Sequence, residues 1–258
     1  MTRKIELHEN HPRYLSLLTR EKLVTGFKGG LVAPEGLIAH GRGECFDYLL
    51  GECTTESARA AINVASAMLL HAKYPVISVN GNVTALCVEQ ICGLNRSIEN
   101  SVIEINLFYY TKERERLISE EFKKYGLTEL LGIDPKYLVS IPELESNRRL
   151  VDQDGISKAD VVFVPLEDGD RTMALKRMNK RVVTVDLNPL SRTALTSDIT
   201  IVDNIVRVIP QLIECIEYHK KYSSEDDLNE LIERFDNIDG LRMALEVMKS
   251  KQVSVLEN

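Results

Sequence analysis

The fold is decided by a stretch that reads Pro75-Val-Ile-Ser-Val-Asn-Gly-Asn82. The apolar run over residues 75–79 ends at once in turn residues, which is typical of a buried strand of a parallel sheet. A helical period precedes it over residues 56–73, and another follows it near residues 85–94. The face shared by the first of these helices is apolar: Ala58, Ala61, Ile62, Ala65, Met68 and Leu69. A strand between two helices predicts a βα repeat rather than a hairpin.

The same alternation continues toward the C-terminus. Further strands are predicted over residues 102–107, 128–131, 160–165, 181–186 and 198–202, and further helices over residues 112–125, 171–179, 191–196 and 205–222. Six strands alternating with helices predict an α/β fold, a Rossmann-like and mostly parallel sheet with helices on both faces. The tail reads as two charged amphipathic helices, whose apolar stripes cover either the edge of the domain or a partner subunit.

The N-terminal segment differs in composition from this core. A helix is predicted to begin near His11-Pro12 and to end at Gly26. Seven of the 14 glycines of the chain lie between Gly26 and Gly51, interleaved with charged and apolar residues. We therefore expect an ordered, functional, glycine-rich loop. We therefore predict a single α/β domain in three parts: residues 1–54 with the helix and the loop, the core at 55–222, and the helical tail at 223–258.

Charge and composition restrict the classes of function that the chain can have. The net charge of −7 over 258 residues argues against nonspecific binding of nucleic acid. Residues 11–42 instead carry five cations against two anions, which predicts a local site for an anion. The sequence shows neither a signal peptide nor an apolar run long enough for a membrane span, so we expect a cytoplasmic protein without a membrane partner. The five cysteines form no CxxC pair, and we assign no residue to a metal.

Polar residues follow the predicted strands, at the edge where parallel sheets bind ligands. They are Asn80 and Asn82 after the first strand, Asn106 at the end of the second, Asp186, Leu187 and Asn188 after the fifth, and Asn204 after the last. Ordinary turns have much the same composition, so each residue alone is ambiguous. Asp186 could bind the hydroxyls of a ribose, and a helix starting with Arg192 and Thr193 could face a phosphate. The alternative is a capped short helix with a surface arginine.

Two common nucleotide motifs are missing. The glycines from Gly36 to Gly43 have the spacing of a P-loop, but Arg42-Gly43 stands where Lys-Ser/Thr is required. No GxGxxG follows a predicted strand, which argues against a nicotinamide or flavin dehydrogenase.

Two long stretches carry a resemblance to a known family. They read Gly30-Leu-Val-Ala-Pro-Glu-Gly-Leu-Ile-Ala-His-Gly-Arg-Gly-Glu-Cys-Phe-Asp-Tyr-Leu-Leu-Gly-Glu52 and Thr184-Val-Asp-Leu-Asn-Pro-Leu-Ser-Arg-Thr193. Further matches are His11-Pro-Arg-Tyr14, Arg20-Glu21, Pro75–Asn82, and Glu104–Phe108 with Thr111 and Arg114. Together these stretches resemble archaeal phosphopantothenate synthetase. The likeness extends to about Pro210, and the tail matches more loosely.

The resemblance implies a homodimeric ligase of coenzyme A biosynthesis. Such an enzyme uses ATP to adenylate the carboxylate of 4-phosphopantoate, releases pyrophosphate, and passes the acyl group to beta-alanine with release of AMP. The nucleotide contacts that it implies are Arg20, Arg42, Asp186, Leu187, Asn188, Arg192, Thr193 and Asn204. Mg²⁺ is expected with ATP, held largely by the nucleotide phosphates.

Arg20 and Arg42 are predicted to bind the phosphates and to act in catalysis. Lys28 and His40 are weaker catalytic candidates. Asn80, Asn82 and Asn106 are candidates for holding 4-phosphopantoate and beta-alanine. A hydrogen bond that orders the loop explains His40 as well as proton abstraction does. Two other functions fit the same sheet: a kinase-type enzyme that releases ADP, and a noncatalytic nucleotide-binding regulator.

Overall fold

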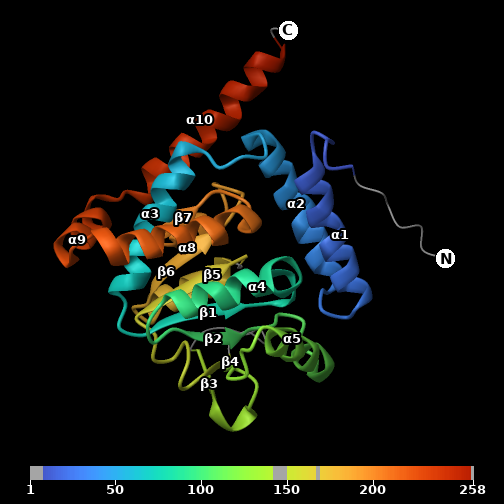
Figure 1. Cartoon of the computed structure of the whole chain (residues 1–258), viewed down its shortest axis with the longest axis vertical. Coiled ribbons are helices and arrows are strands. Elements are labelled where there is room, and N and C mark those ends of the chain that lie inside the picture. The colour runs from blue at the N-terminus through green and yellow to red at the C-terminus, as the bar shows by residue number, and fades with distance from the viewer. Residues whose placement is uncertain (1–7, 142–149, 167–168, 257–258) are drawn as a thin grey trace.

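A computed structural model describes residues 8–141, 150–166 and 169–256, and side chains as far as Ser250. Its centre is a parallel sheet of five strands in the order β2-β1-β5-β6-β7 (Figure 1). The strands are β1 (Pro75–Val79), β2 (Val102–Ile105), β5 (Val161–Pro165), β6 (Arg181–Val185) and β7 (Ile199–Ile201). The chain runs from β1 outward to β2 and then returns to the other side of β1 to form β5. The direction of the strand order therefore reverses between β1 and β5.

The helices lie on both faces of the sheet, as predicted. They are α1 (Tyr14–Lys28), α2 (Pro34–Leu50), α3 (Glu56–His71), α4 (Gly81–Ser97), α5 (Lys112–Lys124), α6 (Gly169–Arg177), α7 (Arg192–Thr196), α8 (Ile205–Tyr222), α9 (Glu225–Arg234) and α10 (Asn237–Leu256). Successive residues of β1 contribute to opposite faces of the sheet. Ile77 belongs to the large core with α3, α4 and α8, whereas Val76 belongs to the core that α6 covers. This alternation follows from the two-residue period of a strand.

The strand predicted at residues 128–131 is wrong. Leu131 forms an isolated parallel bridge to Glu104, in which its N–H donates to the Ile103 carbonyl over 2.9 Å. Gly132 then turns the chain away with a φ of +82°, a conformation that favours glycine. The chain instead forms a separate antiparallel pair, β3 (Leu138–Ser140) and β4 (Leu150–Asp152), so the parallel sheet has five strands rather than six.

The predicted end of the first helix at Gly26 is also wrong. The helix continues to Lys28, and Gly26 is buried inside it against α4. A Cβ atom on Gly26 would lie 2.7 Å from the Cβ atom of Ala85. The glycine allows two helices to cross closely and does not cap the first one.

The glycine-rich loop predicted between Gly26 and Gly51 is for the most part a helix, α2. Pro34 occupies its first turn, where the missing N–H costs nothing, and Gly51 ends it in the left-handed conformation with a φ of +88°. Gly36 packs against the Asn82 side chain of α4, and Gly43 faces Leu187. Tertiary packing has overridden the low helix propensity of glycine here.

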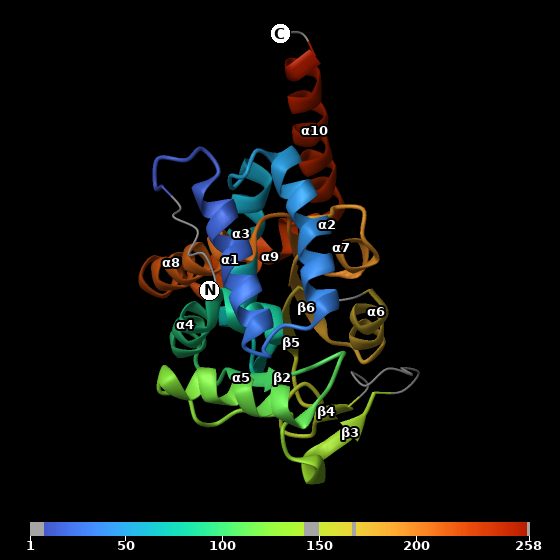
Figure 2. The same cartoon turned by 90° about the vertical axis from the view of Figure 1, so that its right-hand side faces the viewer.

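The C-terminal tail forms two helices, as predicted. α9 begins with a capping box formed by Ser224 and Asp227. α10 buries Leu241, Ala244 and Met248 in a cluster that Leu50 of α2 and Ala194 of α7 complete, so this part of the tail covers an edge of the domain. Beyond it α10 projects away from the body (Figures 1 and 2). Among the described residues, no helix is long and apolar enough to cross a membrane.

Candidate active site

A cavity of about 620 Å³ lies at the carboxyl ends of the sheet strands, where the strand order reverses. One wall is α2, which lies beside α1 (Figure 2). The rest of the lining comes from the segments after β1, β2, β5 and β6, from Arg114 of α5, and from the beginnings of α4, α6, α7 and α8. Open parallel sheets bind their ligands at this position. The early arginine-bearing segment therefore lies over the predicted edge of the sheet, although as a helix.

Asn80 and Asn82 form the part of the cavity that follows β1. Asn80 caps α4 by accepting from the Val83 N–H, and its Nδ2 donates to the Leu166 carbonyl after β5 over 3.1 Å. Asn80 thus joins the two strands between which the order reverses. Asn82 Nδ2 donates to the Gly36 carbonyl over 2.9 Å, which fixes α4 to α2.

Gly81 brings the start of α4 close to the segment between α1 and α2. A Cβ atom at Gly81 would lie 2.0 Å from the Leu31 carbonyl oxygen. The same oxygen accepts from Arg114 Nη2 over 3.0 Å, and Arg114 also donates to the Tyr109 carbonyl. Arg114, Tyr109 and Phe108 line the cavity but were not predicted as site residues. The only signal in the sequence was that Phe108 and Arg114 belong to a matched segment.

Asp186, Leu187 and Asn188 line the cavity after β6. The Asp186 carboxylate accepts from the Asn188 N–H over 2.9 Å and from the Ser191 hydroxyl. Burial raises the pKa of Asp186, and these two hydrogen bonds offset part of the effect. Ser191 also caps α7, so it holds the carboxylate and the helix start together. Its role at the site was not predicted.

Arg192 and Thr193 of α7 also line the cavity. Arg192 is exposed and pairs with Asp170 over 2.6 Å, whereas Thr193 is buried. Asn204 completes this side at the beginning of α8, where its side chain caps the helix. All the predicted nucleotide contacts except Arg20 therefore meet at one cavity.

His40 and Arg42 project from α2 into the same cavity. Burial lowers the pKa of His40 from its ordinary value of 6.5, which favours the neutral ring. Its Nε2 atom is buried and has no hydrogen-bond partner among the described residues. Arg42 is exposed and forms no ion pair within the described part of the chain. An unpartnered ring nitrogen and an unpaired cation suit a proton acceptor and a phosphate ligand.

Arg20, Lys28 and Asn106 lie outside the cavity lining. Arg20 is on α1, and its Nε donates to both carboxylate oxygens of Glu44, over 2.8 and 2.9 Å. Lys28 is the exposed last residue of α1. Asn106 is buried and donates to Glu104 over 2.9 Å. Sequence alone did not indicate which face of α1 turns toward the sheet or that Asn106 turns inward.

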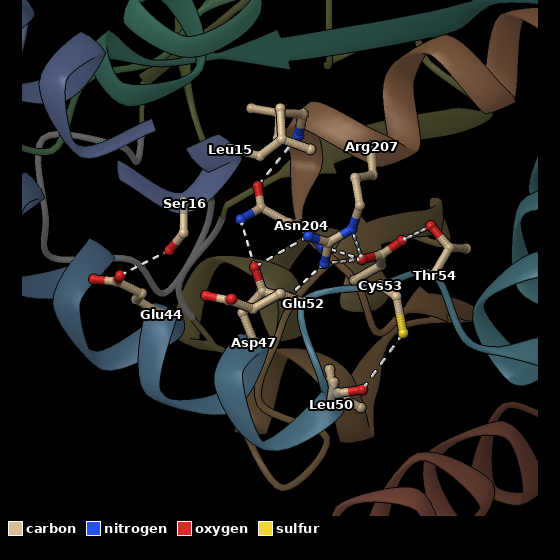
Figure 3. A network of polar contacts seen from close by, with 12 residues as sticks. Leu15, Ser16, Glu44, Asp47, Leu50, Glu52, Cys53, Thr54, Asn204 and Arg207 are labelled. Carbon is tan, nitrogen blue, oxygen red and sulfur yellow. Dashed lines mark hydrogen bonds and ion pairs between the residues drawn. The ribbon is translucent and has the colours of Figure 1, made fainter. Parts of the chain in front are cut away.

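A buried ionic network joins α2 to the beginning of α8 (Figure 3). Its carboxylates are Asp47, which is 2% exposed, and Asp203, which is 1% exposed. Arg207 donates to both of them. Burial on its own lowers the pKa of Arg207, but the hydrogen bond to Asp47 and the charge of Asp203 outweigh it and raise the pKa. The network was not predicted, because α2 and the start of α8 lie more than 150 positions apart in the sequence.

The helix starts at the cavity wall suit an anionic ligand. α4 and α8 both begin at this wall, and a helix N-terminus carries free N–H donors and a partial positive charge. Asp186 offers a fixed acceptor on the same wall. In the described part of the chain, no group of three or more His, Cys, Asp or Glu side chains is arranged to hold a metal ion.

Comparison with known proteins gives a consistent result. A family model described as Phosphopantothenate/pantothenate synthetase matches residues 57–251. A protein of Thermococcus kodakarensis named 4-phosphopantoate--beta-alanine ligase is 54% identical over 234 residues, which cover 90% of this chain and 88% of the relative. Proteins with the same name from Methanosarcina mazei and Methanospirillum hungatei are 49% and 44% identical, over 90% and 96% of this chain and 90% and 99% of their own lengths.

Proposed function

Because the chain belongs to the phosphopantothenate/pantothenate synthetase family, we propose that it joins 4-phosphopantoate to beta-alanine in an ATP-dependent reaction that forms 4'-phosphopantothenate. This is a carbon–nitrogen ligase step of coenzyme A biosynthesis. The observation that carries the proposal is the 54% identity to a relative with this name over 90% of the chain. The cavity at the carboxyl edge of the sheet supports it, since its helix starts suit phosphates.

In the proposed reaction, ATP first activates the acid. A carboxylate oxygen of 4-phosphopantoate attacks the α-phosphorus of ATP, and pyrophosphate leaves. The neutral amine of beta-alanine then attacks the acyl carbon, AMP leaves, and the nitrogen loses a proton. Adenylation is required because a free carboxylate has no competent leaving group, and fixed cations stabilise the charge that develops on the phosphate oxygens.

The nucleotide side of the proposed site is the wall formed by the segment after β6, α7 and the start of α8. Asp186 accepts hydrogen bonds from the ribose, next to Leu187 and Asn188. Arg192, Thr193 and Asn204 lie beside the phosphates, and Arg42 reaches them from α2. Arg20 reaches the phosphates only if its bond to Glu44 opens. Mg²⁺ accompanies ATP and is held largely by the phosphate oxygens.

The other end of the cavity takes the acid and the amine. Asn80 and Asn82 hold 4-phosphopantoate at the start of α4, where the helix terminus attracts its phosphate. His40 accepts the proton that the amine loses, a role that its neutral ring permits. The predicted roles of Lys28 and Asn106 stay predictions without a supporting contact.

The proposal extends to assembly and location. A cytoplasmic homodimer is expected from the resemblance and from the sequence. Large apolar side chains on neighbouring helices are exposed and suit a subunit interface: Leu15 of α1, Ile38 and Tyr48 of α2, and Met243 of α10.

The proposed function is tested by incubating the purified protein with ATP, Mg²⁺, 4-phosphopantoate and beta-alanine. Mass spectrometry is expected to find 4'-phosphopantothenate and AMP in equal amounts, and neither product when any substrate is omitted. Release of ADP would select a kinase-type enzyme. ATP binding without turnover would select a noncatalytic regulator.

A further inference from the structure

The buried network between α2 and α8 has one member that lines the cavity, Asn204, and that residue is fixed by a carboxylate on α2. Asn204 Nδ2 donates to Asp47 Oδ2 over 2.9 Å, and its Oδ1 accepts from the Val206 N–H over 3.3 Å. Both ends of the amide are therefore engaged (Figure 3). Asp47 does not line the cavity itself.

The chemistry of the two partners fixes which way the amide points. An ionised carboxylate only accepts hydrogen bonds, so it selects the NH₂ end of the Asn204 amide. The carbonyl end must then face α8, where it caps the helix. If the amide were reversed, its oxygen would face the Asp47 carboxylate and its NH₂ group would face the Val206 N–H. Both contacts would become repulsive.

The network holds two carboxylates and one guanidinium in a buried place. Among the residues that the structure describes, Arg207 is the cation that pairs with both Asp47 and Asp203. Each carboxylate also receives one neutral side-chain donor: Asp47 from Asn204, and Asp203 from the Thr54 hydroxyl over 2.6 Å. Such donors stabilise an excess buried negative charge that one guanidinium cannot neutralise. Loss of either donor or of either carboxylate unbalances the network.

We propose that Asp47 is a positioning residue for ATP: it sets the direction of the Asn204 amide and, through it, the α8 end of the nucleotide wall. The inference rests on the proposed function, because it takes ATP as the ligand of that wall. It also gives α2 a second task besides carrying His40 and Arg42. The helix that covers the cavity fixes one of the groups on the opposite wall.

The test compares two nearly isosteric variants of the same network in the full-length chain. Asp47→Asn keeps the shape of the side chain but no longer dictates the direction of the Asn204 amide. Thr54→Val removes the donor at the far end of the network, at a residue that does not line the cavity. Calorimetry measures the Kd for ATP alone, steady-state assays measure KM and kcat, and thermal unfolding measures stability.

We expect Asp47→Asn to raise the Kd and the KM for ATP about tenfold, equivalent to about 1.4 kcal/mol. The KM for beta-alanine and the kcat at saturating ATP are expected to stay within about twofold of the unsubstituted protein. Thr54→Val is expected to lower the midpoint of thermal unfolding with an unchanged Kd for ATP. If Asp47→Asn leaves the Kd for ATP unchanged, whether or not the stability of the protein falls, Asp47 has only a structural role and the proposal is overturned.

A third variant tests whether the effect passes through Asn204. In Asn204→Ser the hydroxyl still caps α8 but is too short to reach Asp47. In that background, Asp47→Asn is expected to add no further rise in the Kd. A second tenfold rise, on the scale of about 1.4 kcal/mol, would show that Asp47 acts by another route. Should Asp47→Asn not fold, Asn204→Ser alone is compared with Thr54→Val, and equal affinities for ATP would overturn the proposal.

Failure of the inference and failure of the proposed function have different signatures. If the unsubstituted protein neither binds ATP nor forms the amide, the proposed function is wrong. If it does both and the variants do not differ, only the role of Asp47 is wrong.

Discussion

Arg42 is the cation of α2 that the cavity leaves open to a ligand, since it is exposed and forms no ion pair within the described ranges. Arg42→Ala is expected to slow the release of AMP about 100-fold or more, because one fixed charge that stabilises a transition state contributes about that much. Arg116→Ala on α5 is the matched control: this arginine is also exposed, but it pairs with Glu113 and Glu120. Similar rates for the two variants would remove Arg42 from the mechanism.

His40 predicts a pH dependence with a definite sign. Burial lowers its pKa below 6.5, so the neutral ring that accepts a proton persists to lower pH than for an exposed histidine. The rate of amide formation at low beta-alanine concentration is therefore expected to fall only below that value. In His40→Gln the rate is slower, and the decrease in rate that protonation of the histidine causes at low pH is absent. The ratio of the two rates is measured between about pH 5 and 8, around the ordinary histidine pKa. A constant ratio contradicts the role of His40.

Two glycines of α2 distinguish the effect of tertiary packing from the effect of helix propensity. A Cβ atom on Gly41 would meet no other atom within 4 Å, whereas a Cβ atom on Gly36 would lie 2.3 Å from Asn82 Oδ1. Gly41→Ala is expected to stabilise the protein by about 1 kcal/mol without loss of activity. Gly36→Ala displaces Asn82 from its hydrogen bond and is expected to lower activity about tenfold or more, because small misplacements of binding groups are costly. Thermal unfolding and the ligase assay measure both, and equal behaviour of the two variants contradicts this explanation of α2.

Some helices and strands could be predicted from the sequence, and others could not. The β1 strand was predicted with its observed bounds and α8 likewise, because each is a regular apolar pattern between clear polar boundaries. The helix α2 was not predicted, because a glycine-rich sequence is typical of a loop. The residues that pack against its glycines, Asn82 and Leu187, are distant in sequence. The isolated bridge at Leu131 depended on a turn at Gly132 that local patterns do not reveal.

The site was predictable where it follows the sheet and not where it depends on helix packing. Asn80, Asp186 and Asn188 were found because parallel strands place their carboxyl ends at one edge. Arg20 was placed beside phosphates by resemblance, whereas in the fold it is bonded to Glu44 between two helices. Asp47 lies in a matched stretch, but the sequence did not indicate its role, because its partners Asn204 and Arg207 are brought to it only by the complete tertiary structure.

The assembly of the protein is predicted by the exposed apolar side chains of α1, α2 and α10, which favour self-association. Light scattering is expected to give twice the chain mass of 29.2 kDa at micromolar concentration. Met243→Lys on α10 would place a charge in the proposed interface and is expected to weaken the dimer without unfolding the chain, since Met243 is 51% exposed. A monomeric mass for the unsubstituted protein contradicts the proposed dimer.

The proposed mechanism requires that α2 closes a nucleotide site over the carboxyl edge of the parallel sheet. A crystal structure with a non-hydrolysable ATP analogue tests this arrangement most directly. We expect the ribose beside Asp186 and the phosphates between Arg42 of α2 and the start of α8. A nucleotide bound on another face of the sheet, away from α2, would contradict the arrangement.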